Sequence, residues 1–97
     1  MKKMLFIMNP YSGKRRANKY LVEILEMFNR AGYRVTVHMT AGQGDATEVA
    51  RAMGAEMDIV VCCGGDGTFN ETVAGVMQCG REGPVGYIPP GATNDFA

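Results

Sequence analysis

The residues of this sequence best suited to chemistry form a glycine-rich run with one carboxylate, Cys63 to Thr68 (CGGDGT). The run follows an apolar stretch that begins at Met57 and precedes apolar residues at helical spacing, which predicts a turn from a buried strand into a helix. Glycines let a ligand approach the backbone closely, and the first N–H groups of a helix are unpaired and partially positive. The turn is therefore suited to binding phosphate.

Asp66 needs a separate explanation, because a carboxylate beside bound phosphates repels them. Its usual uses in such a place are to hold Mg²⁺, directly or through water, or to orient a hydroxyl that attacks phosphorus. Both uses indicate phosphoryl transfer, with Asp66 as the catalytic and metal-binding residue. A structural alternative fits equally well: Thr68 and Glu71 match the capping box of an ordinary helix, which needs no ligand.

Two familiar nucleotide-binding motifs are excluded. The Rossmann pattern requires a glycine where Asn70 stands, and no stretch matches the Walker A pattern, because Gly13 and Lys14 are followed by Arg15. The charges balance to zero, and no basic stripe extends beyond residues 14–16, so we expect no nucleic-acid partner. No apolar run suits a signal peptide or a transmembrane segment, which predicts a cytoplasmic protein.

Other reactive side chains are given no role in the chemistry. The cysteines of the 97-residue chain lack metal-ligand or redox spacing, so we expect reduced and mostly buried thiols. His38 is expected on the polar face of a strand, at the surface. Most methionines, Met39 and Met77 among them, are expected to fill the core.

The elements that position the glycine turn alternate between strand and helix along the chain. Apolar patterning predicts strands at 4–8, 33–39, 57–63 and 85–88, and helical stripes at 17–28, 45–53 and 69–77. A second capping box is expected at Asp45 and Glu48. This order predicts an α/β fold, a three-layer sandwich in which helices cover both faces of a mostly parallel sheet.

Ligands of such sheets bind at the carboxyl ends of the strands. We therefore expect the loops 9–14, 40–44, 64–68 and 89–97 to gather on one edge of the sheet. The segment from Asn9 to Gly13 can present backbone N–H groups and a hydroxyl to phosphate, with Lys14 as a nearby charge. The alternative for this segment is an ordinary Asn-Pro turn.

Together these residues resemble the diacylglycerol kinase catalytic domain family, which includes soluble bacterial lipid kinases and enzymes that phosphorylate sphingosine and ceramide. The resemblance covers the whole chain in order and rests on Asn9-Pro10 with Ser12-Gly13, Gly64 to Thr68 with Asn70-Glu71, and Pro90 to Ala97. The glycine-aspartate motif also occurs in NAD kinases and phosphofructokinase-like enzymes. Asn-Asp-Phe-Ala after Pro-Gly is characteristic of the lipid-kinase branch.

The resemblance implies an NAD kinase/diacylglycerol kinase-like N-terminal domain that transfers phosphate from Mg²⁺-ATP to a lipid hydroxyl. ATP contacts are implied at Asn9, Pro10, Tyr11, Ser12, Gly13 and Thr40. Phosphate and Mg²⁺ handling is implied at Gly65, Asp66, Gly67, Thr68, Phe69, Asn70 and Glu71. At one position the chain departs from the pattern, since Ala92 stands where such enzymes often carry threonine.

Members of this family continue for about another domain or two beyond a first domain of this size. We therefore expect residues 1–97 to be the N-terminal nucleotide-binding portion, with little or no kinase activity alone. The lipid substrate, the general base and any contact with the inner membrane surface are expected from an absent C-terminal domain. An unfinished sheet edge favours a homodimer. The alternatives are an NAD kinase-like enzyme, or a truncated non-catalytic module that binds nucleotide or protein.

Overall fold

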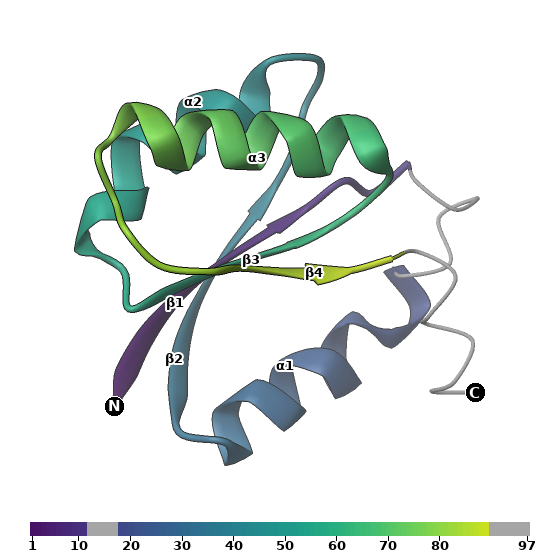
Figure 1. Cartoon of the computed structure of the whole chain (residues 1–97). Coiled ribbons are helices and arrows are strands. Elements are labelled where there is room, and N and C mark those ends of the chain that lie inside the picture. The colour runs from purple at the N-terminus through teal and green to yellow at the C-terminus, as the bar shows by residue number, and fades with distance from the viewer. Residues whose placement is uncertain (12–17, 90–97) are drawn as a thin grey trace.

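Strands and helices alternate along the chain in a computed structural model that describes residues 1–11 and 18–89 (Figure 1). The elements are β1 (Lys2–Met8), α1 (Leu21–Arg30), β2 (Tyr33–Met39), α2 (Asp45–Met53), the short 3-10 helix η2 (Gly54–Glu56), β3 (Ile59–Cys63), α3 (Asp66–Gln78) and β4 (Val85–Ile88). The predictions for Ser12, Gly13 and the closing segment 90–97 lie outside the described residues. None of the helices in the described ranges is long and apolar enough to span a bilayer.

Within the described residues, the strands form one parallel sheet in the order β2-β1-β3-β4. Figure 1 shows α1 on one face of this sheet and α2 with α3 on the other. The predicted three-layer α/β sandwich is thus confirmed. The connections from β1 to β2 and from β2 to β3 leave on opposite faces, so the topological switch point of the sheet lies between β1 and β3.

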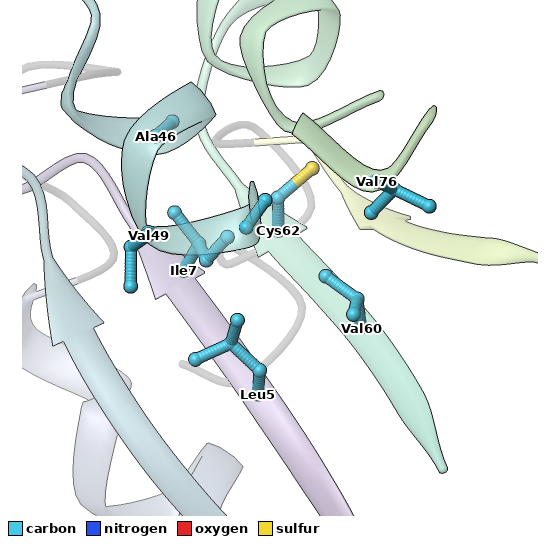
Figure 2. Close-up of a cluster of buried hydrophobic side chains, with 8 residues drawn as sticks. Leu5, Ile7, Ala46, Val49, Val60, Cys62 and Val76 are labelled. Atoms are coloured by element: carbon cyan, nitrogen blue, oxygen red, sulfur yellow. The ribbon is translucent and has the colours of Figure 1, made fainter. Parts of the chain in front are cut away.

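The unbroken apolar run of β1 is explained by burial on both faces of the sheet. Leu5 and Ile7 pack beneath α2 and α3, next to Val60 and Cys62 of β3 (Figure 2). The alternate residues of β1 pack beneath α1, where the rings of Phe6 and Phe28 meet edge to face with centroids 5.6 Å apart. Parallel strands covered on both faces read as continuous hydrophobic runs, as this one does.

Helices α2 and α3 pack against each other at a position that only glycine allows. A Cβ atom on Gly75 would lie 2.4 Å from the carbonyl oxygen of Thr47 and 2.7 Å from Cβ of Ala50. The hydroxyl of Thr47 also donates a 2.8 Å hydrogen bond to the carbonyl oxygen of Glu71. These contacts fix the two helices relative to each other, and with them the loops that precede them.

The core contains fewer methionines than predicted. Met39 and Met77 are 44% and 74% exposed, so the prediction that both are core residues is wrong. Met39 lies at the end of the edge strand β2, and Met77 lies in the last turn of α3. Their spacing assigns each to an apolar face, but no helix or strand among the described residues covers that part of the face.

The prediction of free, mostly buried thiols is confirmed for the cysteines. Cys62 and Cys63 are buried, and Cys79 is partly buried. Burial raises the pKa of the Cys62 thiol to about 11 and also raises the pKa of Cys63. These thiols therefore stay protonated at neutral pH and act as apolar core groups.

Candidate functional site

A cavity of about 260 Å³ opens at the carboxyl ends of β1 and β2, beside the first turn of α3. Its lining is made by Asn9, Tyr11, Thr40, Ala41, Gly42, Gln43, Ala46, Gly67, Thr68 and Glu71. The loops after β1 and β2 contribute, and so do the start of α2 and the start of α3. The structure thus brings together the described parts of three of the loops that the sequence places on one edge.

The first turn of α3 has no side-chain cap from residues 1–11 and 18–89. Gly65 precedes the helix in an extended conformation, with φ −80° and ψ −172°, and none of these residues caps the first N–H groups with its side chain. The alternative of a capping box at Thr68 and Glu71 is therefore wrong, because the helix begins at Asp66 and Thr68 lies inside it. Uncapped N–H groups at a helix N-terminus carry partial positive charge and favour an anion.

Thr68 ties this turn to the loop after β1. Its side chain is buried, and its Oγ1 accepts a 3.3 Å hydrogen bond from Nδ2 of Asn9. The backbone N–H of Asn9 donates to the carbonyl oxygen of Cys63 at 2.9 Å. A Cβ atom on Gly64 would lie 2.7 Å from the Thr68 hydroxyl oxygen, so this close packing requires glycine at residue 64.

The loop after β2 is tied to both α2 and α3. The N–H of Ala41 donates a 2.7 Å hydrogen bond to Oδ2 of Asp45, and the N–H of Gly44 donates a 3.0 Å hydrogen bond to Oε1 of Glu71. Oδ2 of Asp45 also lies 3.0 Å from Nε2 of His38. The hydrogen bond from Ala41, and after it the one with His38, hold the pKa of Asp45 below its usual value.

One further expectation is wrong next to this loop. The capping box at Asp45 and Glu48 does not form, because Gly44 precedes α2 at φ 88° and no side chain of the described residues caps the helix, while Glu48 pairs with Arg51. His38 on β2 is expected at the surface, which fits a side chain that is 35% exposed, and its Nε2 pairs with Asp45.

Asp66 lies at the start of α3 but does not line the cavity. Next to β4, the hydroxyl of Tyr87 donates a 2.9 Å hydrogen bond to the carbonyl oxygen of Gly64 in the glycine turn. Partial burial, and after it the negative charge of Asp66, raise the pKa of Tyr87. Asp66 is therefore close enough to Tyr87 for its charge to act on the Tyr87 hydroxyl. Phe69 packs there too, with its ring centroid 5.0 Å from that of Tyr87.

The structure divides the residues predicted for nucleotide binding into two groups. The cavity lining includes Asn9, Tyr11, Thr40, Gly67, Thr68 and Glu71. Other predicted residues are not part of the lining, namely Pro10, Gly65, Asp66, Phe69 and Asn70. Residue type and spacing do not single out Ala41, Gly42, Gln43 and Ala46 individually. For Ala41, Gly42 and Gln43, the only signal in the sequence is that they belong to the loop 40–44. The sequence gives no such signal for Ala46.

A divalent cation fits this site only if it is shared with a ligand. The described residues contain no group of three or more His, Cys, Asp or Glu side chains that could hold a metal. Mg²⁺ commonly uses one or two carboxylates together with substrate phosphates and water. The exposed carboxylate of Asp66, next in sequence to the cavity residue Gly67, fits such shared coordination.

Comparisons with known proteins agree on one family. The diacylglycerol kinase catalytic domain matches residues 3–97. The diacylglycerol kinases of Bacillus subtilis (strain 168) and Staphylococcus haemolyticus (strain JCSC1435) are 43% and 42% identical to this chain and cover 100% and 93% of it. A crystal structure of a diacylglycerol kinase from Bacillus anthracis str. Sterne covers 91% of this chain and 32% of its own, with a TM-score of 0.73 at 26% identity. This chain spans about a third of the length of these relatives, 32% and 28% for the first two.

Proposed function

This chain belongs to the diacylglycerol kinase catalytic domain family, and on that premise we propose that it forms the nucleotide-binding portion of an ATP-dependent lipid kinase. The observation that supports the proposal most strongly is the cavity at the carboxyl edge of the sheet, where the uncapped first turn of α3 meets Asn9 and Thr40. Phosphate groups suit a helix N-terminus of this kind. The reaction is transfer of a phosphoryl group from ATP to a lipid hydroxyl.

In this proposal the N–H groups of Gly67 and Thr68 bind phosphate oxygens of ATP. Asn9, Tyr11 and Thr40 surround the other atoms of the nucleotide that lie in the cavity. The cavity, at about 260 Å³, is smaller than the roughly 300–1,000 Å³ of typical ligand pockets, so it holds only part of a nucleotide. A helix N-terminus contributes about 0.3–1 kcal/mol to anion binding, while millimolar affinity requires about 4 kcal/mol. Two or three loops must therefore act together, and we expect them to give an affinity no tighter than the millimolar range.

Asp66 is assigned to Mg²⁺ in this proposal. When bound, the ion neutralises charge that develops on the transferring phosphoryl group. Asp66 would hold the ion together with phosphate oxygens, which removes the repulsion between its carboxylate and the nucleotide. Its position beside the cavity rather than in the lining suits a group that contacts the metal and not the nucleotide base.

The acceptor lipid and the general base are assigned to the part of the catalytic domain that lies outside these residues, because this chain spans 32% of the Bacillus subtilis relative. We expect a cytoplasmic protein that meets its lipid at the inner membrane surface. Both outer strands, β2 and β4, have one unpaired side within the described sheet, so a homodimer through such an edge remains a prediction that light scattering can test.

Calorimetric titration of the chain tests nucleotide binding. We expect ATP to bind more tightly with Mg²⁺ than without it, and the Asp66→Ala variant to lose that difference while it keeps its affinity for ATP alone. NAD should not compete with ATP. Equal binding of ATP by wild type and variant in the presence of Mg²⁺ would contradict the role of Asp66, and competition by NAD would favour an NAD kinase-like enzyme.

A chimeric enzyme tests the reaction. This chain can replace the matching segment of the Bacillus subtilis diacylglycerol kinase, which is 43% identical to it. The chimera should phosphorylate diacylglycerol in mixed micelles, and the same chimera with Asp66→Ala should be inactive. A chimera that is folded by circular dichroism and binds ATP, yet does not phosphorylate the lipid, would contradict the proposed function.

A further inference from the structure

Hydrogen bonds hold the loop after β2 at both of its ends. At the first end, the N–H of Thr40 donates to the carbonyl oxygen of Met8 at 2.8 Å, and the N–H of Ala41 donates to Asp45 Oδ2 at 2.7 Å. At the second end, the N–H of Gly44 donates to Glu71 Oε1 at 3.0 Å. The conformation of this short loop is therefore fixed by partners on β1, α2 and α3.

Two N–H groups between these ends remain available. Those of Gly42 and Gln43 have no hydrogen-bond partner within residues 1–11 and 18–89. Both residues are exposed and both line the cavity. Backbone N–H groups are strong donors, and a ligand in the cavity can supply the acceptors that the protein does not.

The carboxylate of Asp45 is the centre of this arrangement, although Asp45 does not line the cavity. One oxygen, Oδ2, accepts from the N–H of Ala41 and lies 3.0 Å from Nε2 of His38. The side chains of His38 and Asp45 are 35% and 27% exposed. Because His38 belongs to β2, it links the carboxylate to the sheet, and the carboxylate in turn fixes the peptide that leads into Gly42.

We propose that His38 and Asp45 are positioning residues that hold the loop 41–44 so that the N–H groups of Gly42 and Gln43 bind the nucleoside part of the nucleotide. This inference rests on the proposed function. The loop is attached to Glu71, one helical turn beyond Gly67 and Thr68, where the phosphates are expected. The acceptors at Gly42 and Gln43 are therefore ribose oxygens or ring nitrogens of the base.

The first test compares ligands by NMR of backbone amides in the wild-type chain. ATP should shift the amides of Gly42, Gln43, Gly67 and Thr68, whereas inorganic tripolyphosphate should shift only Gly67 and Thr68. Shifts from ATP at Gly67 and Thr68 without shifts at Gly42 and Gln43 would overturn this inference and leave the proposed function standing. No ATP-dependent shift at any of these amides would overturn both.

The second test compares variants. Asp45→Ala and His38→Ala should weaken ATP binding about three- to tenfold, as expected for the loss of one hydrogen bond, and should leave tripolyphosphate binding unchanged. His38→Gln should restore most of the affinity, because its amide nitrogen can occupy the place of Nε2.

Asp58→Ala is the matched control, since Asp58 accepts a backbone hydrogen bond from Lys3 at 2.6 Å away from the cavity. It should leave ATP affinity unchanged. The positioning role is wrong if Asp58→Ala weakens ATP binding as much as Asp45→Ala does. It is also wrong if His38→Gln binds ATP no better than His38→Ala.

Discussion

At both the carboxyl edge and the amino edge of the sheet, an aspartate carboxylate accepts a backbone hydrogen bond, but the surroundings of the two carboxylates differ. At the carboxyl edge, Asp45 accepts a backbone hydrogen bond from Ala41 at 2.7 Å, and at the amino edge Asp58 accepts one from Lys3 at 2.6 Å. In each case a carboxylate ties a strand end to a neighbouring segment. The edges differ in what happens to the remaining polar groups.

At the amino edge a side chain of the protein supplies donors for backbone acceptors. The guanidinium group of Arg81 donates to the carbonyl oxygens of Met57, Asp58 and Pro84, most closely to Asp58 at 2.6 Å. At the carboxyl edge, no side chain in the described part of the protein caps the first turn of α3, and the N–H groups of Gly42 and Gln43 have no partner there either. The comparison indicates that one edge closes the fold and that the other leaves donors for a ligand.

The largest effect is expected from Gly64→Ala at the carboxyl edge. The new Cβ atom would lie 2.7 Å from Oγ1 of Thr68, so the first turn of α3 must move away. Overpacking of this kind costs about 1–3 kcal/mol of stability, and ATP binding should be lost with the displaced turn. Thermal unfolding and calorimetry measure the two effects.

Gly65→Ala is the control for this substitution, because a Cβ atom on Gly65 would meet no atom within 4 Å. Its unfolding temperature should match that of the wild type. If Gly64→Ala and Gly65→Ala have the same stability, the close packing between Gly64 and Thr68 is not what holds the turn.

The next largest effect is expected in thiol labelling, which compares a cysteine in the interior with a cysteine near the amino edge. Burial raises the pKa of Cys62 to about 11 from 9.0, which lowers its thiolate fraction at pH 8 about hundredfold. Cys79 is only partly buried. Iodoacetamide should therefore label Cys79 at least a hundred times faster than Cys62, as measured by peptide mass spectrometry. Equal rates would show that the sheet opens readily.

Arg81→Met tests the amino edge. The substitution keeps an apolar stem of similar length but removes the hydrogen bonds to the carbonyl oxygens, and we expect a loss of about 1 kcal/mol of stability. ATP affinity should not change, because Arg81 does not line the cavity. Urea unfolding and calorimetry check both expectations, and weaker ATP binding by the variant would show that the two edges are coupled.

The smallest effect concerns acid pH. Asp45 has a folded-state pKa below 3.8, so its contribution to stability is present above pH 3.8 and is lost as the pH falls through the folded value. The amide of Ala41 should show a change in chemical shift below about pH 4, as the carboxylate of Asp45 is protonated. In Asp45→Asn that transition should be absent, and a transition that persists would assign the titration to another group.

The sequence predicts the order of elements well, because β1 and β3 are buried on both faces and α1 packs by an apolar stripe. Helix starts were predicted less well. The side chains that resemble capping boxes bind other partners, such as Glu71 with Gly44, 27 positions away in sequence. Periodicity assigns Met39 and Met77 to a face but does not reveal whether another element covers that face.

The candidate site was predicted where side chains have recognisable chemistry and missed where the backbone acts. Thr68 and Asn9 stand out by residue type and both line the cavity. Ala41, Gly42 and Gln43 line it as well, but they contribute through loop backbone whose conformation depends on Asp45 and Glu71. That dependence is tertiary, and no local pattern in the sequence encodes it.

An amide chemical-shift map of the chain titrated with ATP and Mg²⁺ decides where the nucleotide binds. We predict shifts at the carboxyl edge, at Gly67 and Thr68 above all, and none at Lys3 or Asp58 on the amino edge. Shifts that appear equally at both edges, or an absence of shifts at millimolar ATP, would contradict the claim that the carboxyl edge is the nucleotide site.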